Sequence, residues 1–200
     1  MVPVVKFLNE NVFPNISDKM IHLPQRQFGL PGFTRIRGIK QEDAHSLERL
    51  DELCFAATDP NDSGTVNDLL WDADDFRDEI RRYGSVGKVL SVALFRGRDE
   101  SYGYVLGATI GNASAELRGT AVHPDYRKRG IFKHLLTLWE AEMDRYGVRE
   151  VHLHTRTKDN PFYVGAADAF ERTGFRVAQT ISDHYDPGDA AYLMTKQLRR

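Results

Sequence analysis

The sequence has one cysteine, no long apolar run and almost no net charge, and each shortage excludes a class of protein. Cys54 has no partner for an internal disulfide, so we predict a protein of the reducing cytoplasm. No uncharged run reaches the roughly 18 residues that a bilayer requires, so we expect no membrane partner. Because the formal net charge is only -2, we expect no nucleic acid partner either.

What remains is the composition of an ordinary globular chain of 200 residues, 41% of them hydrophobic and 28% charged. No cluster of histidine and cysteine has the spacing of a zinc site, so we predict no metal. Prolines at positions 3, 14, 24 and 31 suit an irregular arm better than a packed element. We therefore predict an N-terminal extension over residues 1–32 and one domain over residues 33–200.

Hydrophobic periodicity predicts an α/β (α+β) domain. Closely spaced strand patterns form a meander, and a βαβ unit follows it, so we expect a mixed, mostly antiparallel sheet of about seven strands with helices on both faces. The predicted strands are 33–37, 88–95, 102–110, 113–122, 148–155, 175–182 and 190–197. The predicted helices are 41–55, about 69–83, 131–146 and 162–172.

The most informative segment joins the strand ending at Val122 to the long helix beginning at Ile131. Its basic loop, Arg127-Lys128-Arg129-Gly130, opens an amphipathic helix, and such a helix start presents unpaired backbone N–H groups to an anion. Gly130 lets the backbone approach a phosphate closely, and a diphosphate would fit there. The alternative is a solvated basic first turn without a ligand.

The run Arg127-Lys128-Arg129-Gly130-Ile131-Phe132 resembles the acetyl-CoA loop of the GNAT family, which reads Gln or Arg, two residues, Gly, one residue, then Gly or Ala. Phe132 departs from it, since the family usually has a small residue there. The resemblance covers about residues 34–198. It implies a GNAT-like fold, acetyl-CoA as co-substrate and N-acetyltransferase activity, nearest in pattern to the ribosomal-protein and peptide N-terminal acetyltransferases.

The resemblance also implies a set of coenzyme-binding residues. The pantetheine arm is expected along the main chain of Thr120, Ala121 and Val122. Main-chain N–H groups at this strand end, near Val122, are expected to stabilise the oxyanion. The diphosphate is expected on Arg127, Lys128, Arg129, Gly130, Ile131, Phe132 and Lys133. Asn160 matches a position that often touches the coenzyme, although a turn residue before Pro161 is equally compatible with the pattern.

Acetyl transfer to an amine requires a group that removes a proton from the nucleophile. Glu116 is the first candidate, because it lies at the same offset before Arg127 as the catalytic glutamate of the histone acetyltransferase branch. Strand alternation would place Glu116 on one face with Arg118 and Thr120. The alternative is a surface carboxylate paired with Arg118.

The peptide branch places a glutamate on the next strand and a tyrosine acid in the following helix, and this chain departs at both positions. His154 stands where the glutamate would be, and an imidazole could itself act as base or be a satisfied histidine at a strand end. Phe170 replaces the tyrosine, so Tyr163, Tyr185 or water would supply the proton.

Two further segments are candidates for binding the acceptor. Residues 183–187 resemble a substrate loop of the N-terminal acetyltransferases, or else form a polar hairpin turn. The acidic run at Asp72, Asp74, Asp75, Asp78 and Glu79 could attract a cationic amine, although a solvated helix face is the favoured interpretation.

The sequence thus predicts an acetyl-CoA-dependent N-acetyltransferase that acts by direct attack of a primary amine, with a peptide or protein amine favoured over a small molecule. Cys54 is too far upstream to suggest a nucleophile. A monomer or a homodimer fits equally. The alternatives are a non-catalytic acyl-CoA-binding module on the same fold and, less favoured, a nucleotide-binding protein, which would lack the usual glycine spacing.

Overall fold

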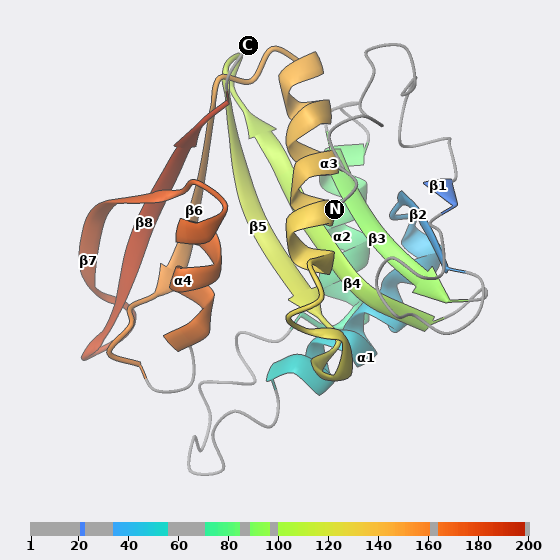
Figure 1. Cartoon of the computed structure of the whole chain (residues 1–200), viewed down its shortest axis with the longest axis horizontal. Helices are drawn as coiled ribbons and strands as arrows, with labels where there is room; N and C mark the ends of the chain where they lie inside the picture. The colour runs from blue at the N-terminus through green and yellow to red at the C-terminus, as the bar shows by residue number, and fades with distance from the viewer. Residues whose placement is uncertain are drawn as a thin grey trace.

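A single sheet organises the molecule, and only one neighbouring strand pair in it is parallel. The computed structural model describes residues 21–22, 34–55, 71–84, 89–96, 100–160 and 164–198. Its eight strands have the order β1-β2-β3-β4-β5-β6-β8-β7 (Figure 1). The strands are β1 (Ile21–His22), β2 (Thr34–Gly38), β3 (Val89–Arg96), β4 (Glu100–Ile110), β5 (Ser114–Val122), β6 (Glu150–Arg156), β7 (Arg176–Asp186) and β8 (Asp189–Gln197).

The predicted fold class is confirmed, with one strand more than expected. β1, at Ile21 and His22, lies within the predicted N-terminal extension and pairs antiparallel with β2. Two residues are too short to give a periodic signal, so the sequence pattern could not reveal this strand. The domain boundary at residue 33 stays a prediction.

The helices cover opposite faces of the sheet (Figure 1). They are α1 (Ala44–Phe55), α2 (Ala73–Gly84), α3 (Ile131–Arg145) and α4 (Val164–Arg172). Trp139 of α3 is fully buried in the larger core, together with Phe170 of α4 and Val151 of β6. Leu47 of α1 and Phe76 of α2 form a second core on the other face. The sheet therefore separates an α3–α4 side from an α1–α2 side.

Gly107 of β4 allows Trp139 to pack directly against the sheet. A Cβ atom at position 107 would lie 2.5 Å from Cζ2 of Trp139 and 2.5 Å from the carbonyl oxygen of Glu116. We predict that Gly107→Ala lowers the free energy of unfolding by about 1–3 kcal/mol, because neither the strand nor the indole has room to move. Urea unfolding would measure the change.

Gly165→Ala is the matched control, because a Cβ atom there meets nothing within 4 Å and the residue lies in α4. It should stabilise the protein slightly, by roughly 0.5–1 kcal/mol. Equal unfolding midpoints for wild type and Gly107→Ala would contradict the close packing of Trp139 against β4.

β5 and β6 pair only at their beginnings and then separate. Their parallel ladder joins Ser114, Ala115 and Glu116 to residues 150–152. Beyond this point the strands diverge toward their carboxyl ends, which leaves a gap in the sheet (Figure 1). The N-terminus of α3 lies beside the carboxyl end of β5 because only residues 123–130 connect them.

A bulge at Arg118 corrects the predicted arrangement of side chains on β5. Leu106 of β4 pairs with Gly119, whereas Gly107 pairs with Leu117, so Arg118 is the extra residue. The alternation of faces shifts by one beyond it, and Gly119 therefore faces the Tyr104 ring on the α1–α2 side. Glu116 and Arg118 still share a face, but Thr120 lies on the opposite one, contrary to the sequence prediction.

The predicted substrate loop at residues 183–187 is largely strand. Residues 183–186 belong to β7, and the turn reduces to Pro187 and Gly188 between the paired residues Asp186 and Asp189. Asp183 adopts a φ of 51° at an irregularity in the ladder, and its Oδ1 accepts the N–H of Gly188 at 2.6 Å. This local bond lets the strand continue past the predicted end.

Candidate active site

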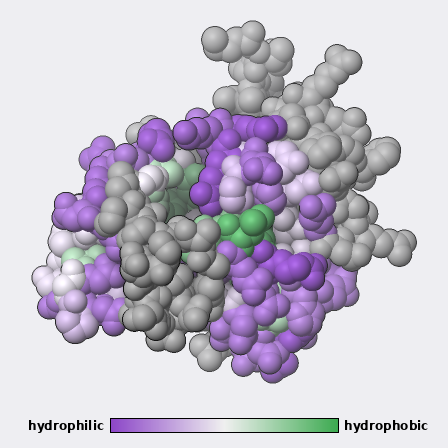
Figure 2. Space-filling model, turned by 90° about the horizontal axis from the view of Figure 1, so that it is seen from below, coloured by the Kyte–Doolittle hydropathy of each residue, from purple (hydrophilic) through white to green (hydrophobic). Residues whose placement is uncertain are grey.

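The gap between β5 and β6 opens into a cavity of about 210 Å³. Residues from both sides of the sheet line it, so the cavity connects the α1–α2 side with the α3–α4 side. They are Asp51 and Phe55 of α1, Trp71, Tyr104 of β4, residues 117–120 of β5, residues 153–156 of β6, Ala166 and Phe170 of α4, and Tyr185 of β7. Viewed from below, apolar residues gather in the middle of a largely hydrophilic face (Figure 2).

The N-terminus of α3 has the properties of an anion site. Gly130 is its N-cap with a φ of 84°, and no side chain caps the first turn. The N–H groups that begin the helix therefore have no intrahelical acceptor and are available to a phosphate. Lys128 also adopts a left-handed φ of 62°, which turns the loop tightly before Gly130. These features fit a diphosphate group.

The basic residues of this loop differ in their contacts, since two arginines form hydrogen bonds to its main chain. Arg127 donates from Nε to the Val122 carbonyl at 3.0 Å, and Arg129 donates to the Asp125 carbonyl at 3.0 Å. Both guanidinium groups therefore hold the loop in shape. Lys128 and Lys133 are exposed and can add positive charge near the helix N-terminus.

The two apolar residues of the predicted loop differ in how deeply their side chains are buried. Ile131 is 2% exposed and packs in the core, so only its main chain could reach a ligand. The ring of Phe132 meets that of Phe170 edge to face, with centroids 5.4 Å apart. Phe132, which replaces the small residue of the family pattern, thus fills space between α3 and α4 with its ring.

The main chain at the end of β5 presents polar groups to the gap. His123 donates its N–H to the Tyr102 carbonyl on β4. Because an antiparallel ladder alternates, Ala121 also faces β4, whereas the N–H groups of Thr120 and Val122 point toward the gap. The Val122 carbonyl already accepts hydrogen bonds from Arg127 and Cys54. Of the three predicted pantetheine contacts, the backbone of Thr120 and Val122 is thus directed suitably and that of Ala121 is not.

The structure brings the two predicted bases together on the α1–α2 side. Glu116 Oε2 accepts a hydrogen bond from Arg118 at 3.0 Å, and its Oε1 lies 3.8 Å from Nδ1 of His154. Arg118 also forms an ion pair with Glu79 of α2. The surface pairing of Glu116 with Arg118 is therefore present, but one carboxylate oxygen remains directed at His154.

His154 lines the cavity and stacks on His184 of β7, with ring centroids 4.8 Å apart and planes 15° apart. Burial lowers the pKa of His154 below its ordinary value, and the neighbouring His184 lowers it further, although Glu116 opposes the change. His154 is therefore a neutral imidazole at neutral pH, the form that can accept a proton.

The other predicted site residues are placed as follows. Tyr185 lines the cavity beneath the Arg156 guanidinium, 5.1 Å from the ring centroid. Asn160 lies in the turn after β6, where its N–H donates to the Thr157 carbonyl. Tyr163 lies outside the described residues.

Sequence reasoning missed the buried pair Asp51 and Tyr104. The Tyr104 hydroxyl donates to Asp51 Oδ1 at 2.5 Å, and both side chains line the cavity. Asp51 lies four residues after Leu47 and three before Cys54, on the buried face of α1. That spacing was a usable signal, although an aspartate at such a position is ordinarily interpreted as exposed.

Burial raises the pKa of Asp51 from 3.8 to about 6, against the smaller opposing effect of the Tyr104 hydrogen bond. Because the folded state holds this proton more tightly than the unfolded chain, stability falls as pH rises from 3.8 to about 6, and the loss is complete above that pH. We predict that Asp51→Asn raises the free energy of unfolding at pH 8 by about 1–3 kcal/mol and leaves it nearly unchanged at pH 4.

Urea unfolding at the two pH values would test this prediction, with Glu52→Gln on the exposed side of α1 as the matched control. The control should change stability by less than about 0.5 kcal/mol at either pH. Destabilisation of Asp51→Asn at pH 8 would mean that the ionised carboxylate supports the fold.

Cys54 is closer to the site than its sequence position suggested. Its thiol donates to the Val122 carbonyl at 3.4 Å, at the end of β5. Cys54 is therefore not remote from the site, contrary to the sequence prediction, but its surroundings also disfavour a nucleophile. Burial raises the pKa of the Cys54 thiol, which keeps it protonated and weakly nucleophilic.

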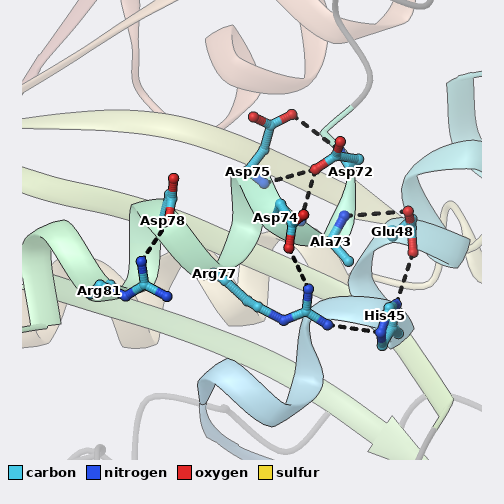
Figure 3. Close-up of polar contacts among 9 residues, drawn as sticks. All are labelled: His45, Glu48, Asp72, Ala73, Asp74, Asp75, Arg77, Asp78 and Arg81. Carbon is cyan, nitrogen blue, oxygen red and sulfur yellow. Dashed lines mark hydrogen bonds and ion pairs between the residues drawn. The ribbon is translucent and has the colours of Figure 1, made fainter.

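The acidic run of α2 is occupied by local contacts (Figure 3). Asp72 accepts the N–H groups of Asp74 and Asp75, and Asp75 accepts that of Asp72 in return, which caps the helix. Asp74 and Asp78 form ion pairs with arginines three residues later. These contacts support the favoured interpretation of a solvated, self-paired helix face for the four aspartates. Glu79 departs from it, because its side chain is buried and pairs with Arg118 of β5.

Residues 45–175 match the Acetyltransferase (GNAT) family, and the chain belongs to that family. It is thus an acetyl-CoA-dependent N-acetyltransferase by class, as the loop resemblance predicted. No curated protein matches the sequence. Within the part of the chain that the structure describes, there is no group of metal-ligating side chains and no helix long and apolar enough to cross a membrane.

Solved structures with the same fold cover most of the chain at low sequence identity. The ribosomal-protein-S18-alanine N-acetyltransferase from Escherichia coli has 19% identity and a TM-score of 0.65, covering 84% of this chain and 95% of that chain. Ard1 from Thermoplasma volcanium has 16% identity and a TM-score of 0.67, covering 84% and 99%. PaiA N-acetyltransferase from Thermoplasma acidophilum, in complex with coenzyme A, has 24% identity and a TM-score of 0.65, covering 82% and 99%.

Proposed function

We propose that this acetyltransferase binds acetyl-CoA across the gap between β5 and β6 and transfers the acetyl group to a primary amine that enters from the α1–α2 side. The observation that carries the proposal is the uncapped N-terminus of α3 at Gly130, placed at the end of β5 where the gap opens. Its N–H groups would hold the diphosphate, and the backbone of Thr120 and Val122 would hold the pantetheine arm. The coenzyme supplies an activated thioester carbonyl.

His154 is proposed as the general base, with Glu116 as its positioning residue. His154 lines the cavity, and its Nδ1 faces the Glu116 carboxylate. The imidazole Nε2 is then the atom that accepts the proton of the attacking nitrogen. This assignment keeps both predicted residues, but the first candidate for the base is now His154, whereas the sequence analysis favoured Glu116.

Two further groups complete the proposed chemistry. The Val122 N–H, directed toward the gap, would donate a hydrogen bond to the carbonyl oxygen as negative charge develops there. Tyr185 lines the same cavity and is proposed to donate a proton to the departing sulfur. The nitrogen forms its bond to the carbonyl carbon as the carbon–sulfur bond breaks, so no enzyme-bound acyl group is needed.

A thiol-release assay with acetyl-CoA and a panel of primary amines would test the function. The panel contains peptides with free N-termini, lysine, diamines and amino alcohols, and calorimetry measures coenzyme binding in parallel. We expect amine-dependent release of coenzyme A. Binding without release for every amine would favour the non-catalytic acyl-CoA module instead.

A further inference from the structure

The wall of the cavity formed by α1 and β4 combines a carboxylate with aromatic rings. Asp51, Phe55, Trp71 and Tyr104 all line it. Trp71 and Phe76 rings lie 5.2 Å apart, and Phe76 meets Tyr104 edge to face, so the rings are packed firmly in place. Aromatic faces and a carboxylate together are the surroundings that proteins provide for ammonium groups.

Asp51 is only 3% exposed and has no cationic partner among residues 36–55, 71–81, 100–160 and 165–198. Carboxylates are rarely buried so deeply without one, since desolvation is costly. Oδ1 accepts the short hydrogen bond from the Tyr104 hydroxyl. Oδ2 has only the backbone N–H of Trp71 at 3.4 Å, which is longer than the usual N–H to oxygen hydrogen bond. Oδ2 can therefore accept a strong hydrogen bond from a ligand in the cavity.

The position of Asp51 separates it from the reacting centre. Tyr104 pairs with Ala121 of β5, so its backbone lies one strand spacing, roughly 4.8 Å, from β5 and farther from the β5–β6 gap. Asp51 contacts the hydroxyl end of Tyr104, which lies on the α1–α2 side over Gly119 of β5, 3.5 Å from the position of a Cβ atom there. His154 lies on the far side of the gap, on β6. Asp51 and His154 therefore line the same cavity from opposite sides of the gap, so one acceptor can place a nitrogen at each.

We propose that Asp51 binds a second cationic nitrogen of the acceptor, so that the acceptors of this enzyme are aliphatic amines with two positive charges a few bonds apart. The inference rests on the proposed function, in which the first amine of the acceptor is acetylated. A cavity of about 210 Å³ suits a diamine or one basic side chain beside a reacting amine. Tyr104 is a positioning residue that fixes the Asp51 carboxylate.

The sharpest test compares 1,4-diaminobutane with 4-amino-1-butanol, which differ by one charged group. We expect wild type to prefer the diamine at least about tenfold in kcat/KM at pH 8. Asp51→Asn should remove this preference by lowering kcat/KM for the diamine alone. Glu52→Gln, on the exposed face of the same helix, should keep it. Equal rates for the two amines in wild type, or an equal loss for both in Asp51→Asn, would overturn the proposal.

A second arm separates small acceptors from peptides by comparing peptides that carry lysine or norleucine next to the free N-terminus. Preference for lysine that disappears in Asp51→Asn supports the same site with a peptide source. Calorimetric titration of the diamine into the protein with coenzyme A keeps the test independent of turnover. If no amine causes release of coenzyme A, the proposed function is wrong. The calorimetric titration then still tests whether Asp51 binds the diamine. Diamine binding unchanged in Asp51→Asn would refute it.

Discussion

Gly130→Glu is expected to weaken acetyl-CoA binding at least about 100-fold. Gly130 has a φ of 84° at the N-cap of α3, where the backbone must approach the diphosphate closely. A glutamate there places a side chain over the N–H groups and a negative charge beside the negative charge of the diphosphate. Isothermal titration calorimetry with acetyl-CoA measures the loss directly.

Gly147→Glu is the matched control for this substitution. Gly147 ends the same helix with a φ of 82°, and a Cβ atom there meets nothing within 4 Å. Both variants should lose a similar amount of stability, roughly 1–2 kcal/mol, because each forces a side chain into the left-handed region. Only Gly130→Glu should lose coenzyme affinity. Equal affinities for the two variants would show that the basic loop is not the diphosphate site.

His154→Gln is expected to lower kcat by roughly 10²–10³-fold at neutral pH while coenzyme affinity stays unchanged. The base must be unprotonated to act, so activity should fall as pH drops through the pKa of His154. Burial and His184 lower that pKa, so the acidic limb should lie below the ordinary value of 6.5. A full pH profile of kcat for wild type and variant measures both effects.

Glu116→Gln separates the two candidate bases. The Glu116 carboxylate raises the pKa of His154, whereas His184 and His152 lower it and Arg118 holds the carboxylate in place. If His154 is the base, removing this charge shifts the acidic limb to lower pH and reduces kcat moderately. If Glu116 is the base, the variant loses the limb together with most of its turnover, and His154→Gln stays active.

The succession of helices and strands along the chain and the start of α3 could be predicted because local patterns determine them. Alternating runs define the meander, and Gly130 before an apolar stripe of period 3.6 identifies the helix start at Ile131. The bulge at Arg118 was not predicted, although Gly119 beside it was a usable signal, because an isolated glycine within a strand pattern often marks a bulge. A single extra residue then moved Thr120 to the other face.

The α1–α2 side of the site was the least predictable part. Asp51 is buried because Tyr104, separated from it by 53 residues, supplies a hydrogen bond. Such a pair depends on the packing of α1 against β4, which no short sequence window contains. His154 and His184 are likewise stacked only because β6, β8 and β7 lie side by side.

The most direct measurement is a crystal structure of the protein with acetyl-CoA, supported by a calorimetric titration in solution. The account predicts the linked phosphates on the first N–H groups of α3 after Gly130, and the pantetheine arm between β5 and β6. Phosphates bound elsewhere on the molecule, or no heat of binding at all, would contradict it.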